Sequence, residues 1–152
     1  MSRSWQSIAT PLIQRWESFR AKAYLCPAGV WTIGWGSTGS DIKRGMVWTL
    51  PQADARFAQD LQTFGAGVAR LLRVSAAAHE MAAMVSLAYN IGLTSFSRST
   101  LLRKFNASDR AGAAAQFAVW NKARDRSGVL KALPGLTARR THEASVFRGG
   151  AA

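Results

Sequence analysis

Residues 10–38, TPLIQRWESFRAKAYLCPAGVWTIGWGST, decide the fold, because the hydrophobic pattern changes within them from helical spacing to glycine-punctuated strands. Thr10 and Pro11 are typical of a helix start, with threonine as the N-cap and proline in the first helical position. Apolar residues then recur at helical spacing: Leu12, Ile13, Trp16 and Phe19. The pattern predicts a short helix that carries Glu17 near its C-terminal end.

Aromatic and β-branched residues between glycines mark the second half of this stretch. Two short strands are predicted over Tyr24–Cys26 and Val30–Trp35, joined by a turn at Pro27-Ala28-Gly29. A two-stranded hairpin is too small to be stable alone in water. We therefore expect it to pack against the nearest helix, which is the one that carries Glu17.

The chain after Thr49 is predicted to be helical throughout. Thr49 to Gln52 has the pattern of a capping box, with Pro51 early in the helix. Apolar residues follow at helical spacing: Phe57, Leu61, Phe64, Val68 and Leu71. A second helix is predicted over residues 75–90, with Gly92 as its cap. Shorter helices are predicted over residues 98–105, 109–121 and 136–147.

Together these elements predict an α+β fold in a single domain, residues 1–152. A small N-terminal β-hairpin lobe is joined by the long helix to a helical C-terminal lobe, which leaves a cleft between the two lobes. The hydrophobic content of 48% and the six tryptophans supply the material for a core.

Charge is the strongest compositional signal, since 20 Lys and Arg stand against 8 Asp and Glu, a net charge of +12. Such a field attracts polyanions in general. Nucleic acid, anionic membrane surfaces and bacterial cell-wall polymers all remain open on this ground. The basic residues are evenly shared, ten in positions 1–100 and ten in the last 52.

Several kinds of site and segment are not expected. The single cysteine excludes an internal disulfide. His79 and His142 are isolated and lack the spacing of metal ligands, so no metal site is predicted. No apolar run reaches the roughly 18 residues of a membrane span, and we expect neither a transmembrane segment nor an export signal.

Glu17 is the only acidic residue among the first 40 positions. At the end of a helix and beside a tryptophan-rich hairpin, a carboxyl loses solvation, which favours its protonated form. Such an acid can donate a proton to a leaving group. The alternative is a surface glutamate paired with Arg15 or Arg20.

Thr32 and Cys26 each allow more than one interpretation. The Thr32 hydroxyl could orient a water molecule, or the residue could serve its strand propensity alone. The Cys26 thiol could be a nucleophile, although no histidine lies nearby in the sequence, or a small polar group that holds a water. It could equally be a buried hydrophobic residue.

Arg139 and Arg140 form the densest basic pair and lie in a predicted helix. Because that helix must bury one side, one of the two arginines is expected to face inward.

The spacing of Glu17, Cys26 and Thr32 resembles the catalytic signature of the phage lysozymes, glycoside hydrolase family 24. In that signature a Glu is followed after eight residues by Asp or Cys, and after five more by Thr. SLAYNIGLTSFSRSTLLRKFN is similar to the Asn-x-Gly and Ser-Thr-Leu-Leu segments of the family, and VLKALPGLTARRTHEASVF to its C-terminal Leu-Pro-Gly-Leu and Arg-Arg. Ser37 stands where the family often has histidine, and Ser18 where a glycine commonly follows the Glu.

The resemblance implies a lysozyme-like fold and hydrolysis of the β-1,4 bond between N-acetylmuramic acid and N-acetylglucosamine in peptidoglycan, without a cofactor. It implies that Glu17 is the general acid and that Thr32 and Cys26 position the attacking water. It also implies that Arg140 reaches back to Glu17 and orients it, with Ser37 as a supporting residue. Because a neutral thiol stabilises positive charge poorly, we expect inversion by water rather than a covalent intermediate.

An endolysin of this kind is expected to be a monomer that stays in the host bacterial cytoplasm until a holin opens the inner membrane. Its positive charge then finds a target in the anionic bacterial envelope. The alternative class is a basic module that binds nucleic acid or an anionic envelope polymer and has lost catalysis. Loss of lytic activity on Glu17→Gln substitution would separate the enzyme from the binding module.

Overall fold

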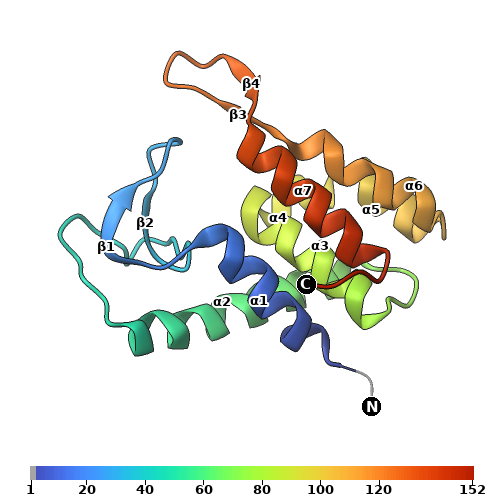
Figure 1. Ribbon diagram of the computed structural model, residues 1–152, viewed down its shortest axis with the longest axis horizontal. Helices are drawn as coiled ribbons and strands as arrows, with labels where there is room; N and C mark the ends of the chain where they lie inside the picture. Colours follow the sequence, from blue (N-terminus) through green and yellow to red (C-terminus); the bar gives the residue numbers. More distant parts are fainter. Residues whose placement is uncertain (1–2) are drawn as a thin grey trace.

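The computed structural model describes residues 3–152, so residues 1 and 2 of the predicted domain lie outside the described part. In chain order the elements are α1 (Trp5–Glu17), β1 (Arg20–Leu25), β2 (Trp31–Gly34), α2 (Leu50–Leu71), α3 (Ala78–Ile91), α4 (Leu93–Ser97), α5 (Thr100–Asn106), α6 (Arg110–Gln116), a 3₁₀ helix (Phe117–Trp120), β3 (Lys122–Arg124), β4 (Leu130–Ala132) and α7 (Pro134–Phe147). Figure 1 shows a small lobe around β1 and β2, a larger helical lobe, and α2 running between them. The predicted α+β architecture, with a long helix joining two lobes, is confirmed.

Helix α1 begins at Trp5, and the prediction that it starts at Thr10 and Pro11 is wrong. Ser4 is the N-cap, and its hydroxyl accepts a hydrogen bond from the Ser7 N–H at 3.2 Å. A serine cap satisfies one of the free donors at a helix start, as a threonine would. Pro11 is accommodated inside the helix.

The first hairpin pairs β1 with β2 in antiparallel register, with Tyr24 opposite Thr32. Its turn is closed by a hydrogen bond of 2.8 Å from the Gly29 N–H to the Cys26 carbonyl. Gly29 has φ +80°, a conformation that favours glycine. Below the hairpin lies a small core of its own, formed by Ala23, Ile33 and Ile42 with the partly buried Trp31, Met46 and Trp48.

The capping box predicted for the long helix is confirmed. The Thr49 side chain accepts from the Gln52 N–H, and the Gln52 side chain accepts from the Thr49 N–H. Helix α2 then runs for 22 residues and buries Ala53, Phe57, Leu61, Gly65 and Val68. These residues lie at helical spacing, so α2 presents one continuous apolar face.

Helix α3 is the centre of the helical lobe, because every residue from Glu80 to Tyr89 is buried. It packs against α1, α2 and α7. A helix that is buried on all sides has no polar face to display, and its sequence is accordingly rich in alanine and methionine. Gly92, at φ +91°, caps α3 as predicted.

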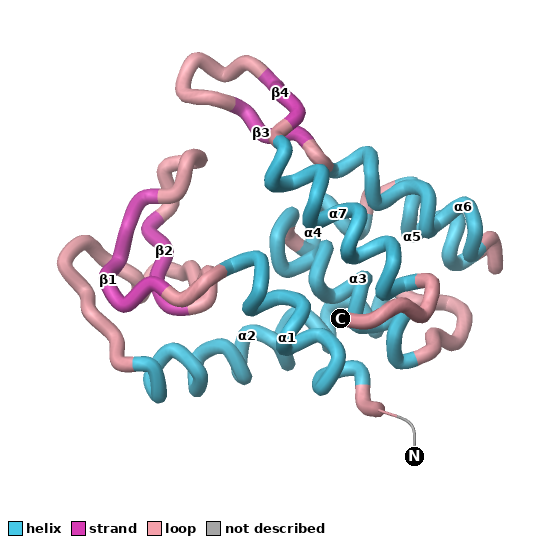
Figure 2. The backbone as a smooth tube through the Cα atoms, in the orientation of Figure 1, coloured by secondary structure: helices cyan, strands magenta, loops and turns pink. Residues whose placement is uncertain are grey.

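A second antiparallel hairpin, β3 and β4, lies within the region that was predicted to be wholly helical, so that prediction is wrong here. The Asp125 carboxylate organises the turn by accepting hydrogen bonds from the Ser127 and Val129 N–H groups at 2.9 and 3.0 Å. In Figure 2 the turn of the first hairpin points towards this second hairpin. Among the helices of residues 3–152, none combines the length and the apolar character that crossing a bilayer requires.

Candidate active site

Glu17 is the last residue of α1, and its side chain retains 16% of its exposure. One carboxylate oxygen, Oε2, accepts a hydrogen bond of 2.5 Å from Nη1 of Arg139. The other oxygen, Oε1, lies against Gly36, where any Cβ atom would collide with it. Gly36 also has φ +82°, so glycine is required there both by the backbone and by Glu17. The carboxyl is therefore held from two sides.

The arginine that reaches back to Glu17 is Arg139, and the prediction that Arg140 does so is wrong. Successive residues of a helix point about 100° apart, so the two side chains leave α7 in different directions. Arg140 donates to the Trp120 carbonyl at 2.7 Å and to the Asn90 side chain. One of the two was expected to face inward, and in the structure both are buried.

Glu143 explains how two arginines can be buried together, and sequence reasoning missed it. Its fully buried carboxylate accepts from Arg139 Nε at 3.1 Å, from Arg140 Nη1 at 2.5 Å and from the Ser86 hydroxyl at 2.5 Å. Buried charges persist in proteins when they are paired and hydrogen-bonded in this way. The available signal was the spacing of Glu143 from the two arginines, which puts all three on neighbouring positions of one helix face.

The two arginines differ in how their charges are compensated. Burial pulls the pKa of Arg139 down, but the carboxylates of Glu143 and Glu17 outweigh it, so the pKa of Arg139 lies above its usual value. For Arg140 burial dominates over the same Glu143 carboxylate and lowers the pKa. Guanidinium groups keep their proton in proteins. The Glu17–Arg139–Glu143–Arg140 network thus pairs two guanidinium groups with two carboxyl groups.

Tyr24 connects Glu17 with the hairpin residues. It lies opposite Thr32 in the sheet. Burial raises the pKa of the Tyr24 phenol, the nearby Glu17 and Cys26 raise it further, and Arg20, whose guanidinium lies 4.2 Å from the ring centroid, opposes them. The phenol is therefore neutral, and Tyr24 lies within electrostatic reach of both Glu17 and Cys26.

Thr32 and Cys26 both donate a hydrogen bond to the same backbone carbonyl. Val30 O accepts a hydrogen bond of 3.0 Å from the Thr32 hydroxyl and another of 3.0 Å from the Cys26 N–H. Thr32 is only 5% exposed, whereas Cys26 is half-buried. Because the Thr32 hydroxyl gives its proton to Val30, the lone pairs of its oxygen are free to accept a hydrogen bond from water.

Ser37 is buried, but its hydroxyl donates to Asp60 Oδ2 at 2.6 Å and not to Glu17. On the other side of Gly36, the Trp35 carbonyl accepts a hydrogen bond of 2.6 Å from the Tyr89 hydroxyl. Helices α2 and α3 thus fix the residues on both sides of Gly36. Ser37 is thus bonded to α2 next to the glycine that borders Glu17.

A cleft opens between the two hairpins. A cavity of about 760 Å³ lies between the first turn, Leu25–Gly29, and the second hairpin. An overlapping cavity of about 1050 Å³ continues from Cys26 to Asn90 and Arg140. Both have the size of ligand sites. Glu17 and Thr32 do not line these two cavities, which reach the ion-pair network at Arg140 and the hairpin at Cys26.

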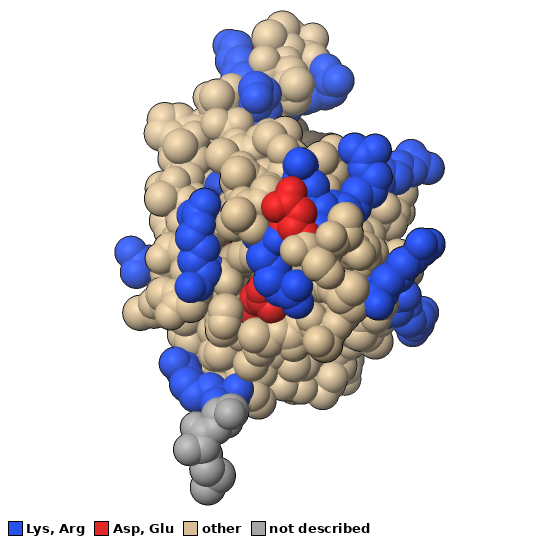
Figure 3. Space-filling view, turned by 90° about the vertical axis from the view of Figure 1, so that its right-hand side faces the viewer, with Lys and Arg blue, Asp and Glu red and all other residues tan. Residues whose placement is uncertain are grey.

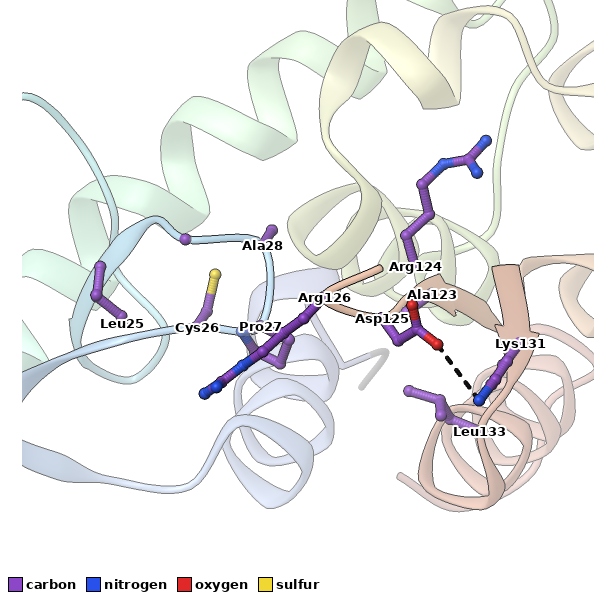
Figure 4. A pocket seen from close by; sticks show the side chains of 11 residues that line it. Leu25, Cys26, Pro27, Ala28, Ala123, Arg124, Asp125, Arg126, Lys131 and Leu133 are labelled. Atoms are coloured by element: carbon purple, nitrogen blue, oxygen red, sulfur yellow. Dashed lines mark ion pairs between the residues drawn. The ribbon is translucent and has the colours of Figure 1, made fainter. Parts of the chain in front are cut away.

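The walls of the cleft differ in character. Figure 4 shows Leu25, Cys26 and Pro27 on one side, with Arg126 extending towards them from the other. The second hairpin carries Lys122, Arg124, Arg126 and Lys131 against the single acid Asp125, which pairs with Lys131 at 3.3 Å. One wall is thus largely apolar and the other is basic. On the face of the helical lobe in Figure 3, basic side chains likewise dominate over acidic ones.

Within residues 3–152, no three His, Cys, Asp or Glu side chains come together as a metal site would require. Glu17, Thr32 and Cys26 supply a carboxyl, a hydroxyl and a thiol, and of these three Cys26 is the one that lines the two cavities. A carboxyl that can donate a proton is one of the two groups that glycoside hydrolysis commonly uses.

Comparison with known proteins identifies the family. The phage lysozyme family model matches residues 14–143. An endolysin of Acyrthosiphon pisum secondary endosymbiont phage 1 is 41% identical over 136 residues, which cover 90% of this chain and 92% of the relative. The solved endolysin from Escherichia coli O157:H7 phage FAHEc1 has a TM-score of 0.85 at 32% identity, over 95% of this chain and 93% of that one.

A second solved structure, the muramidase domain of SpmX from Asticaccaulis excentricus, has a TM-score of 0.84 at 31% identity. The similarity covers 97% of this chain and 98% of that domain. The family match includes Glu17, Cys26, Thr32, Arg139 and Glu143. This chain belongs to the phage lysozyme family, glycoside hydrolases that act on peptidoglycan.

Proposed function

We propose that this protein is an endolysin that hydrolyses the β-1,4 bond between N-acetylmuramic acid and N-acetylglucosamine, with Glu17 as the general acid. The observation that carries the assignment is the double constraint on the Glu17 carboxyl, held by Arg139 at one oxygen and bordered by Gly36 at the other. General acids act efficiently when they are held in a fixed position beside the leaving group.

The proton of Glu17 belongs on Oε1 in this arrangement. Oε2 accepts from the Arg139 guanidinium, which can only donate, so that oxygen serves as an acceptor. Oε1 is the oxygen left to carry the proton to the glycosidic oxygen. As that proton is transferred the C–O bond breaks, and positive charge develops at the anomeric carbon. Arg139 then stabilises the carboxylate that remains on Glu17.

Thr32 and Cys26 would position the attacking water. The Thr32 oxygen accepts a hydrogen bond from that water, because its own proton is given to the Val30 carbonyl. Cys26 lines the cleft, and its backbone is tied to the same carbonyl. The water attacks the anomeric carbon on the face opposite the leaving group. Its surplus proton passes to solvent, from which Glu17 is reprotonated before the next turnover.

The positive charge of the protein supports peptidoglycan as the substrate. Peptidoglycan and the envelope around it are anionic, and the protein has a net charge of +12. The basic second hairpin forms one wall of the cleft. We further propose that the protein acts as a monomer, without cofactor and without specific binding to nucleic acid, and that it remains in the host cytoplasm until a holin admits it to the wall.

Analysis of the products tests this function. Purified peptidoglycan digested with the protein should yield fragments whose new reducing end is N-acetylmuramic acid, as identified by borohydride reduction and mass spectrometry. Proton NMR of the first turnover should show the inverted anomer if water is the nucleophile. New N-acetylglucosamine reducing ends, or released peptides with intact glycan, would contradict the assignment.

A further inference from the structure

Glu143 lies outside the reaction steps described above, yet it is completely buried. It contacts Arg139 and Arg140 on its own helix and the Ser86 hydroxyl on α3. A carboxylate is costly to remove from water, even when it is paired. Its place beside Arg139, which contacts Glu17, indicates a role beyond packing.

Glu17 and Glu143 bind two different edges of the same guanidinium. Glu17 accepts from Arg139 Nη1 at 2.5 Å, and Glu143 accepts from Arg139 Nε at 3.1 Å. Arg140, which pairs with Glu143 at 2.5 Å, faces Glu143 from the other side. The attraction that Glu17 feels from Arg139 is therefore offset by the negative charge of Glu143, and that charge is offset in turn by Arg140.

Beyond these carboxylates, Arg20 lies against the Tyr24 ring, and Asp60, which is paired with Arg56, lies within electrostatic reach of Tyr89. Tyr24 and Tyr89 lie within electrostatic reach of Glu17, and burial raises the pKa of both phenols. Ser86 faces Glu143 and carries no charge. Within residues 3–152, the ion pairs of these two carboxylates are those with Arg139 and Arg140.

We propose that Glu143 and Arg140 are positioning residues that set, in opposite directions, the pH at which Glu17 loses its proton. This inference rests on the proposed role of Glu17 as general acid. A general acid must be protonated to act, so the alkaline limb of the activity profile reports its deprotonation. The two residues thereby fix the upper pH limit of the enzyme.

The sign of each substitution follows from the charges. Glu143→Gln removes a negative charge, which leaves Glu17 facing two arginines and stabilises its ionised form. The alkaline limb should then move down by roughly one pH unit. Arg140→Gln leaves Glu143 less compensated, disfavours ionised Glu17, and should move the limb up by a similar amount. The double variant restores neutrality and should return the limb close to its wild-type position.

A matched control is Ser86→Ala, which removes one hydrogen bond to Glu143 but leaves every charge in place. It should lower stability without moving the limb. A purely structural role for the network would reduce kcat in all four variants while the limb stays fixed, or would move it in one direction only. Either of those results would overturn the proposal.

Direct titration separates this inference from the proposed function. Carbon-13 NMR of the Glu17 carboxyl, in protein labelled at glutamate, reports its ionisation in folded protein without any turnover. Opposite shifts in Glu143→Gln and Arg140→Gln would support the inference even if peptidoglycan were not cleaved. Unchanged titration of Glu17 in folded Glu143→Gln or folded Arg140→Gln protein would refute it, even if the wild type proved to be an active lysozyme.

Discussion

The carboxyl of Glu17 is held by a guanidinium at one oxygen and bordered by a glycine at the other, so its orientation depends on distant parts of the chain. Arg139 lies more than 120 residues away in sequence, and the hydrogen bond that joins them measures 2.5 Å. Gly36 follows the first hairpin. Burial of the Glu17–Arg139 ion pair lowers the stability gained from it, because both groups lose water. The same pair fixes the orientation of the carboxyl, which a general acid needs for efficient proton transfer.

Cys26 allows a direct test at the residue scale. We predict that Cys26→Asp retains activity, because a carboxylate can hold the same water, and that Cys26→Ala loses about 10- to 100-fold in kcat while still folding. Initial rates on purified peptidoglycan, with circular dichroism as the folding control, measure both. Full activity in folded Cys26→Ala protein would leave the thiol with a packing role alone.

The sequence predicts Glu17, Cys26 and Thr32 as site residues, and of two adjacent arginines it names the wrong one as the partner of Glu17. Neighbouring helical residues diverge by about 100°, and the phase of α7 depends on contacts that the sequence does not display. Both arginines are buried because Glu143 neutralises them together. A rule that one side of a helix faces solvent fails where an internal ion pair replaces apolar packing.

At the scale of elements, the site depends on α1 meeting α2 at a close approach. A Cβ atom on Gly65 would collide with the Trp5 ring at the start of α1. Glycine in a helix otherwise costs stability relative to alanine. Gly65 is thus present for the fit between two helices, one of which carries Glu17.

Replacing that glycine should therefore destabilise the protein. We predict that Gly65→Ala lowers the free energy of unfolding by about 1–2 kcal/mol, since overpacking outweighs the better helix propensity. Gly135→Ala is the matched control, because a Cβ atom there meets nothing within 4 Å. This control variant should be neutral or slightly stabilising. Unfolding in urea, followed for both variants and the wild type, measures the free energies of unfolding. Equal stability of Gly65→Ala and wild type would contradict this prediction, because it would show that Trp5 and α2 move apart to accept the Cβ atom without loss of stability.

Elements differ in how well the sequence predicts them. The capping box at Thr49 and the glycine cap at Gly92 were both found, because each has a local signature. The second hairpin was missed, since strands of three residues give no alternating pattern to detect. The start of α1 was misplaced because Pro11 is tolerated inside the helix and Ser4 supplies an equally good cap.

At the scale of the whole molecule, the positive charge of the protein and the cleft between the two hairpins both suit an anionic polymer. In the proposed function, the net charge of +12 would attract an anionic polymer from a distance, and the basic second hairpin would contact that polymer at the cleft. Within residues 3–152, Arg126 has no carboxylate at ion-pair distance, so its guanidinium remains available to a ligand. Charges of this kind act mainly on encounter and affinity rather than on the chemical step.

We predict that Arg126→Glu raises KM for peptidoglycan about three- to tenfold and leaves kcat nearly unchanged. Arg70→Glu is the matched control, because Arg70 is exposed on α2 and does not line the cleft. It makes the same change in net charge and should have a smaller effect. The difference between the two should shrink at high salt, where exposed charges are screened. Equal effects of both variants would assign the attraction to net charge alone.

The central claim, that Glu17 is the general acid of a lysozyme, is tested most directly by Glu17→Gln. The amide has nearly the same shape and can still accept from Arg139, so the variant should fold and bind peptidoglycan, but it has no acidic proton to donate. We predict that the rate at which permeabilised Gram-negative cells lose turbidity falls by at least about 10²- to 10⁴-fold relative to wild type. Clearing of the cells by folded Glu17→Gln protein at the wild-type rate would contradict the account.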